Sequence, residues 1–129
     1  MPTVEEIISS LRSAIENTRN RIAQLESELE TLKAFKRDVE TSHDSFILIR
    51  NKKNQYISDL MTDVTNNKCV TTLSEGMNHT LNMVGVVYVK AAFLALIASI
   101  NLKIAWYEIE IFNEKTSLTG LLGELEGLI

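Results

Sequence analysis

The chain has 129 residues, of which 45% are hydrophobic, 6% aromatic and 23% charged, and its formal net charge is −4. This length gives one domain at most. The apolar content comes from aliphatic rather than aromatic side chains, which is typical of helix–helix interfaces and argues against an all-β fold. The acidic chain also lacks a basic stripe. No nucleic-acid partner is therefore expected, because duplex binding depends mainly on clustered Lys and Arg.

The first half of the chain is predicted to be one long helix, at about residues 4–65. Between Pro2 and Gly76 the sequence contains no other proline or glycine, so nothing there forces the backbone out of a helix. Thr3 and Glu6 fit a capping box, in which each side chain binds the backbone amide of the other residue. The polar residues at 41–45 are of the types that cap helices, so a break or kink there stays open.

A heptad pattern follows the start of this helix. Its apolar residues alternate steps of three and four for more than four repeats, with Ile at most first positions and Leu at most fourth positions. This choice of side chains favours two-stranded packing. The predicted helix seam consists of Ile8, Leu11, Ile15, Ile22, Leu25, Leu29 and Leu32.

The second half of the chain is predicted to fold back antiparallel to the first half. Asn66, Asn67 and Lys68 are the best candidates for a chain reversal, giving a turn at about 66–70. A long helix is expected at about 71–115 and a short, weak helix at about 117–128, where glycines dilute the leucines. The expected fold is all-α: an elongated antiparallel helical hairpin with a coiled-coil-like N-terminal helix and a short C-terminal helix.

The segment from Met83 to Ile104 is unusually apolar, since 17 of its 22 residues are hydrophobic. Small residues line one side of the expected helix, while larger residues line another side. A hairpin covers only one stripe of each helix, so a second helical surface must cover the rest. The residues expected to bind a hairpin mate or a partner are Phe93, Leu96, Ile97, Ile100, Ile104, Tyr107 and Ile111.

A membrane span is the alternative for this segment, because a bilayer crossing needs about 20 predominantly apolar residues. Lys90 and Asn101 lie inside it, however, and a lysine near the centre of a span costs about 2.5–3.5 kcal/mol. Burial against the first helix and a partner is therefore preferred over insertion. The N-terminus lacks a basic stretch followed by an apolar run, so a Sec signal peptide is not expected.

No catalytic constellation is recognisable. His43 and His79 lie in different segments, and neither has a His, Cys or carboxylate residue three or four positions after it. Cys69 is the only cysteine, which excludes an intrachain disulfide. Phosphate-binding glycine loops and dinucleotide fingerprints are missing. The sequence therefore predicts no catalytic residues, no metal site and no cofactor, and nothing in it supports an enzyme.

The layout resembles the small helical proteins encoded beside LXG-domain toxins of the Gram-positive type VII secretion system, the YwqH-like relatives of WXG-type hairpins. The likeness rests on the repeat from Ile15 to Leu32 with its continuation to Asp38, and on the stretch from Ala98 to Ile104 with its continuation to Leu122. It covers most of the chain in layout. The resemblance implies a targeting factor or chaperone that binds the helical N-terminal LXG region of a toxin and promotes its export.

Two family features are missing. The only tryptophan, Trp106, lies far from the expected turn, and no phenylalanine or tyrosine is followed four positions later by an acid, as the family's export signal requires. The resemblance therefore implies a cytoplasmic accessory subunit, with export beside its partner left open and the signal supplied by the toxin complex or a second small helical partner. A small membrane protein of the holin or anchor kind and a structural coiled-coil homodimer are the alternatives.

Overall fold

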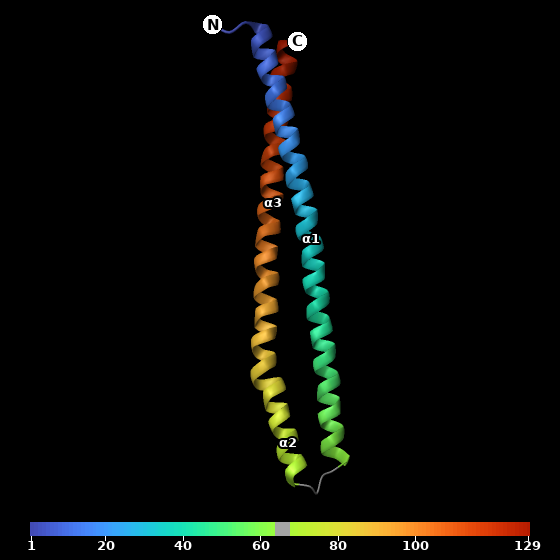
Figure 1. Cartoon of the computed structure of the whole chain (residues 1–129). Coiled ribbons are helices and arrows are strands. Elements are labelled where there is room, and N and C mark those ends of the chain that lie inside the picture. The colour runs from blue at the N-terminus through green and yellow to red at the C-terminus, as the bar shows by residue number, and fades with distance from the viewer. Residues whose placement is uncertain (64–67) are drawn as a thin grey trace. The chain divides into compact units, whose positions relative to one another are not determined.

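The computed structural model describes residues 1–63 and 68–129, apart from the side chains of residues 60–63, 68–70, 83 and 84. The described residues form helices α1 (Val4–Asp63) and α2 (Lys68–Asn78), a π-helical turn η1 (His79–Gly85), and helix α3 (Val86–Leu128) (Figure 1). No strand occurs in this part of the chain. The all-α prediction is thus confirmed, and so is the antiparallel pairing of the N-terminal helix with the C-terminal one.

The capping box at the start of α1 is formed as predicted. The Thr3 backbone amide donates to Glu6 Oε2, and the Glu6 backbone amide donates to Thr3 Oγ1, both at 3.2 Å. These two bonds satisfy backbone donors that the first helical turn leaves free. The start of α1 is therefore held by local interactions.

Helix α1 continues through residues 41–45 without interruption, so the break left open there does not occur. The polar side chains in this stretch lower helix propensity by less than about 1 kcal/mol each, whereas a glycine or proline would cost more. Packing compensates for the loss. His43 contacts Phe93 edge to face, with ring centroids 5.3 Å apart.

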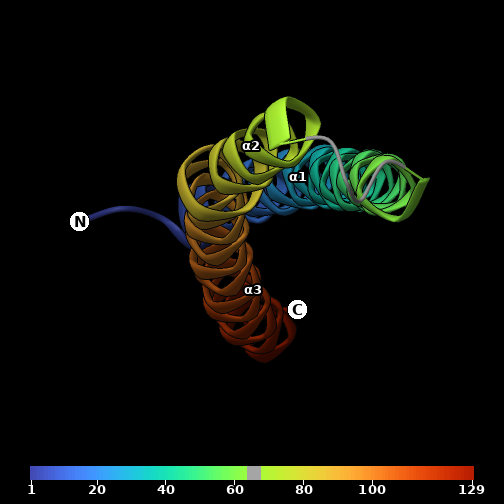
Figure 2. The ribbon, with the colours of Figure 1, turned by 90° about the horizontal axis from the view of Figure 1, so that it is seen from below.

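The second half of the chain differs from the prediction at both of its ends. Residues 66 and 67 of the expected turn lie outside the described residues, while Lys68 to Val70 already belong to α2. The prediction of a separate, weak C-terminal helix was wrong, since α3 runs unbroken to Leu128 through three glycines. Half-buried leucines, which include Leu118, Leu121 and Leu125, hold this last part of the helix in place. Figure 2 shows how α2 leads into α3.

The chain divides into two units, and the first comprises residues 1–34 and 100–129. Here the N-terminal part of α1 packs antiparallel on the C-terminal part of α3. Leu25 is fully buried and packs with Leu29 and Ile111, and Ile104 and Tyr107 cover this cluster. Of the predicted helix seam, the structure buries Ile15, Ile22, Leu25 and Leu29 and half-buries Ile8, Leu11 and Leu32.

Polar pairs set the alignment of the two helices in the first unit. The Tyr107 hydroxyl donates to Glu28 Oε2 at 3.0 Å, and Lys115 Nζ lies 3.2 Å from Glu26 Oε1. Glu26 comes before Glu28 in α1, whereas its partner Lys115 comes after Tyr107 in α3. The two helices therefore run antiparallel. The ion pair is half exposed on both sides, so it contributes little to stability and mainly fixes register.

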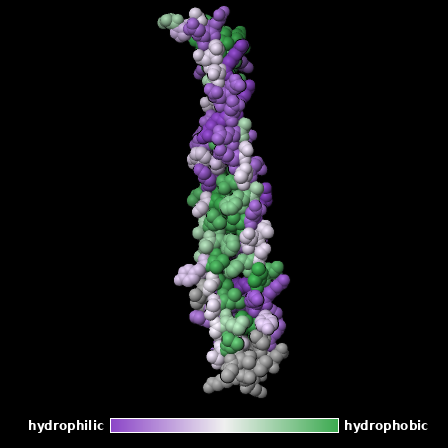
Figure 3. Space-filling model, in the orientation of Figure 1, coloured by the Kyte–Doolittle hydropathy of each residue, from purple (hydrophilic) through white to green (hydrophobic). Residues whose placement is uncertain are grey.

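The second unit comprises residues 35–99. Its buried apolar residues are Val39 and Ile57 of α1 and Val86 of α3. Asn54 and Asn82 exchange two side-chain hydrogen bonds of 2.7 and 3.1 Å, which tie α1 to η1. On the face shown in Figure 3, hydrophobic residues gather over this unit, while hydrophilic residues dominate the first one.

Candidate functional site

A concave apolar surface lies in the second unit and is lined by α1, α2, η1 and the first turn of α3. We call it the groove. Its cavity measures about 960 Å³ and most of its lining is apolar. The lining residues are Phe46, Lys53, Tyr56, Ile57, Thr72, Leu73, Gly76, Met77, Thr80, Leu81, Gly85, Val86 and Val89.

Helical periodicity explains why these residues share one surface. From α2 into η1 the lining residues come in pairs at 72–73, 76–77 and 80–81, which repeat every four residues and so lie on one helix face. On α1, Phe46 and Lys53 are seven residues apart, which is two helical turns. A Cβ added at Gly76 would have no atom within 4 Å, so the groove is open at that point.

Burial divides the groove into a floor and a rim. Ile57 and Val86 are each 5% exposed and belong to the floor. Tyr56 and Leu73, by contrast, are 61% and 63% exposed, although their side chains are large and apolar in character. Exposed apolar groups around a concave apolar surface indicate a protein or ligand contact rather than a solvated surface.

The groove carries little polar chemistry. Lys53 is its one charged lining residue, and Thr72 and Thr80 contribute hydroxyl groups. No carboxylate, histidine or cysteine lines it, and within the described residues no cluster of three His, Cys, Asp or Glu side chains could hold a metal ion. The arrangement can therefore bind an apolar surface and place one positive charge beside it.

Contacts beside the groove hold its two walls together. Asn82 is bonded to Asn54 and also donates to Asn78 Oδ1 at 2.6 Å, so one amide network joins α1 to η1 and to the end of α2. Farther along, Phe93 packs on Phe46 with ring centroids 6.0 Å apart. Because both contacts join α1 to the opposite wall, the separation of the walls is set by specific pairs.

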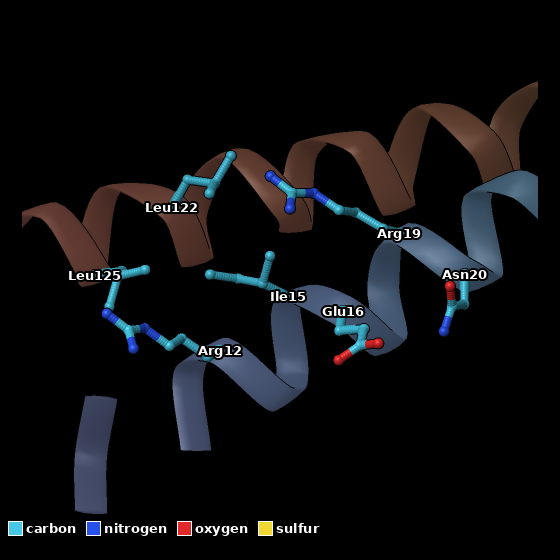
Figure 4. Close-up of a pocket in the computed structure, with 7 residues that line it drawn as sticks. All are labelled: Arg12, Ile15, Glu16, Arg19, Asn20, Leu122 and Leu125. Carbon is cyan, nitrogen blue, oxygen red and sulfur yellow. The ribbon is translucent and has the colours of Figure 1, made fainter. Parts of the chain in front are cut away.

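A smaller cavity of about 470 Å³ lies in the first unit, between α1 and α3 (Figure 4). Ile15 points from α1 towards Leu122 and Leu125 of α3, while Arg12 and Arg19 extend on either side of it. The arginine stems shield the end of the helix seam and keep the guanidinium groups in solvent. This cavity is better explained by packing at the end of the seam than by ligand binding.

The predicted partner-binding residues do not line the groove. Ile100 and Ile111 are buried, and Phe93, Ile97, Ile104 and Tyr107 are half-buried. Leu96 alone is exposed, at 41%. Where contacts are given, these residues face the hairpin mate: Ile111 packs on the α1 leucines, and Phe93 packs on His43 and Phe46. Of the two alternatives, these contacts are with the hairpin mate, and the binding of an external partner by these residues stays a prediction.

The groove could not be found from sequence pattern. Phe46 and Tyr56 stand out as one side of an amphipathic segment, but Leu73 and Met77 join them only because α2 lies opposite α1. The π-helical turn η1 carries the network that joins the walls, and no sequence pattern marks such a turn in advance.

The most apolar part of the chain is also poorly covered. The helical stretch from Thr71 to Leu128 is long and apolar enough to cross a membrane, by length and composition, and in its most apolar window of 18 residues only 12% are buried. Among the described residues this is the one such stretch. The core helix of a soluble protein would be mostly buried, and this window is not.

Comparison with known proteins gives no relative: no protein-family model, no curated protein and no solved structure matches the chain.

Proposed function

We propose that this protein is a non-enzymatic targeting factor that binds a helical segment of another protein in the groove of its second unit. The observation that carries the proposal is the groove itself, a concave surface of about 960 Å³ with exposed apolar residues at its rim. Helix-in-groove recognition uses such a surface to take up the apolar face of an amphipathic helix.

The occupant is a helix with one acidic residue beside its apolar stripe. Lining residues that repeat every four positions along α2 and η1 suit a long apolar stripe better than a small compact ligand. Lys53 supplies a positive charge in an otherwise uncharged lining, so an acidic side chain on the incoming helix would meet it. Charge complementarity of this kind selects the orientation of the partner.

For the identity of the partner we propose the helical N-terminal LXG region of a type VII secreted toxin. The support is the resemblance of the chain's layout to the small helical proteins encoded beside such toxins. Binding there would cover apolar surface on both proteins and keep the toxin region soluble until export. In this proposal the protein acts in the cytoplasm, and the toxin complex or a second small helical partner carries the export signal.

Co-expression with the N-terminal region of the neighbouring toxin, followed by size-exclusion chromatography, tests the proposal. The two chains are expected to elute together. Leu73→Glu introduces a charge at an exposed rim position, so it should abolish co-elution without unfolding the protein. The matched control is Leu48→Glu, at a position that is 55% exposed and outside the groove, and it should leave the complex intact.

Lys53→Glu refines the test of the partner's charge. Reversing this charge should weaken binding by about tenfold or more, and an acid-to-lysine change in the toxin helix should restore it. Separate elution of the wild-type chains would contradict the proposal. If the Leu73→Glu and Leu48→Glu variants bound the toxin region equally well, the binding site would lie outside the groove.

A membrane span is the second candidate, favoured by the low burial of the most apolar window. In the second unit, however, α1 runs alongside that part of α3 and carries Arg50, Lys52 and Lys53. Inserting each of these at the centre of a bilayer would cost about 2.5–3.5 kcal/mol. Recovery of the protein in carbonate-resistant membranes would support this candidate, and recovery in the soluble fraction would support the targeting factor.

A further inference from the structure

Gly76 of α2 lines the groove at a position where packing within the chain does not require a glycine. A glycine inside a helix costs stability relative to alanine, because it loses more conformational freedom on folding. The backbone of Gly76 has no positive φ, and a Cβ added there would have no atom within 4 Å. Neither backbone conformation nor close packing therefore explains a glycine at this position.

The other glycine of the groove has a structural explanation. A Cβ at Gly85 would lie 3.2 Å from the backbone oxygen of Thr80, so the tight backbone of η1 disfavours a larger residue there. Gly123 of α3 is as open as Gly76, but it lines neither of the two cavities described above. Of these three glycines, Gly76 alone leaves open space inside the groove.

Gly76 is one corner of a four-residue hole on the surface of α2 and η1. The corners have the spacing i, i+3, i+4 and i+7, and they are Leu73, Gly76, Met77 and Thr80. Four residues with this spacing form the hole that receives one side chain of a facing helix in coiled-coil packing. All four line the groove and are exposed, so the hole is open to solvent. We call it the socket.

The residues of the socket determine which side chain it fits. Because Gly76 has no side chain, the socket is deeper at that corner than a hole of four larger residues would be. Leu73 and Met77 offer apolar contacts, and the flexible Met77 side chain can adjust to groups of different shape. None of the four residues is charged. The socket therefore suits a large apolar side chain, such as Leu, Met or Phe, rather than a charged one.

The opposite wall of the groove favours a helix as the carrier of that side chain. Lys53 and Tyr56 of α1 line this wall, both are exposed, and they lie about one helical turn apart. A helix between the walls would direct one apolar side chain into the socket and an acidic side chain towards Lys53. Side chains on different faces of one helix point in different directions, so a single helix can make both contacts.

We propose that the socket receives one large apolar side chain of the helix that binds in the groove, and that Gly76 selects for the size of that side chain. This inference rests on the proposed function, because it describes the recognition made by the same site. It makes Gly76 a specificity-determining residue. A larger residue at this position should therefore favour the free helix but weaken the complex, two effects of opposite sign.

Binding of the toxin's N-terminal region to variants of the full-length protein tests the proposal. Gly76→Ala places a methyl group in the socket, so the dissociation constant should rise by about tenfold or more, whereas the midpoint of thermal unfolding should not fall. Gly76→Leu fills the socket and should abolish co-elution. The matched control is Gly123→Leu, at an open helical position outside the groove, and it should bind as the wild type does.

A compensating change identifies the side chain that enters the socket. In the Gly76→Leu background, changing that one residue of the toxin helix to alanine should restore binding, and alanine at other positions should not. Binding by Gly76→Leu equal to that of the wild type would overturn the role of the socket and leave the proposed function standing. Absence of wild-type binding would contradict the proposed function instead.

A second measurement needs no toxin. Amphipathic helical peptides with one acidic residue beside a varied apolar stripe are displayed on phage and selected for binding to the wild-type protein. The selected peptides should share a Leu, Met or Phe whose change to alanine weakens binding by about tenfold or more, and they should fail to bind Gly76→Leu. Equal binding to the wild type and Gly76→Leu, or the selection of no peptide, would overturn the proposal whatever the toxin region does.

Discussion

Tyr107 of α3 donates a hydrogen bond to Glu28 of α1, with Oη 3.0 Å from Oε2. The residues are 79 positions apart in the sequence, so this bond reports directly on the register of the two helices. It raises the pKa of Tyr107, because the neutral hydroxyl is the form that donates to the carboxylate, and partial burial and the negative charge of Glu28 act in the same direction.

The first prediction concerns alkaline pH. Because the pKa of Tyr107 is higher in the folded than in the unfolded protein, the folded form retains its proton more tightly. The stabilisation is therefore fully present below the ordinary tyrosine pKa of about 10, and it is lost as the pH rises through the folded-state value. Tyr107→Phe should lower stability below pH 10 and flatten the decline above it, measured by urea unfolding across the alkaline range.

Glu28→Gln supplies the matching control. It removes the negative charge but keeps a side-chain oxygen at the same place, so the pKa of Tyr107 should fall back towards its ordinary value. NMR titration of the tyrosine ring signals measures that shift. An unchanged pKa in Glu28→Gln would show that the Tyr107–Glu28 bond is not formed in solution.

The second prediction concerns the core of the first unit. Leu25 is fully buried in the cluster with Leu29 and Ile111, so Leu25→Ala leaves a cavity as well as losing transfer free energy. The free energy of unfolding should fall by about 2–5 kcal/mol, measured by urea denaturation monitored by circular dichroism. Leu48→Ala, at an exposed position, should change it by no more than about 0.5 kcal/mol.

The third prediction concerns the amide pair that joins the walls of the groove. Asn54 and Asn82 exchange two hydrogen bonds, each of which contributes about 0.5–1.5 kcal/mol net. A double-mutant cycle with Asn54→Ala and Asn82→Ala should give a coupling free energy of about 1 kcal/mol or more. Asn51→Ala, on an exposed part of α1, provides the reference, and additive effects of the two substitutions would contradict the pairing.

The fourth prediction concerns the glycines of α3. Gly123 lies within the helix, has no positive φ, and has open space where a Cβ would lie. Gly123→Ala should therefore raise the free energy of unfolding by about 0.5–1 kcal/mol. Gly85→Ala is the contrasting case. Its Cβ would lie 3.2 Å from the Thr80 carbonyl oxygen, so it should gain less.

Much of the fold follows from local sequence rules. The capping box and the heptads of the helix seam predict where α1 begins and which of its residues face inward. Both rules work because they depend on neighbours within a helix turn or two. The ends of elements were less predictable. Residues 41–45 and the glycines near the C-terminus favour a break by their type, but tertiary packing keeps both stretches helical.

The side of α3 that packs on α1 was harder to predict, because small apolar residues line one side of the helix and larger ones line another. Hydrophobicity alone cannot choose between them. In the structure, two residues on the packed side have polar partners on α1: Glu28 for Tyr107, and Glu26 for Lys115. Both α3 residues lie on the same side as Ile104 and Ile111. The groove was beyond prediction for a related reason, since its walls meet only after α2 and η1 are in place.

The Asn54–Asn82 pair has a consequence for the order in which the helices come together. Its residues are separated by 28 positions, whereas Glu28 and Tyr107 are separated by 79. Closing the longer segment directly would cost about 0.9 kcal/mol more in chain entropy than closing the shorter one. Once the Asn54–Asn82 pair has formed, however, the remaining contacts between the helices can form one after another towards the chain ends. We therefore expect amide hydrogens near Asn54 to gain protection from exchange before those near Glu28 during refolding.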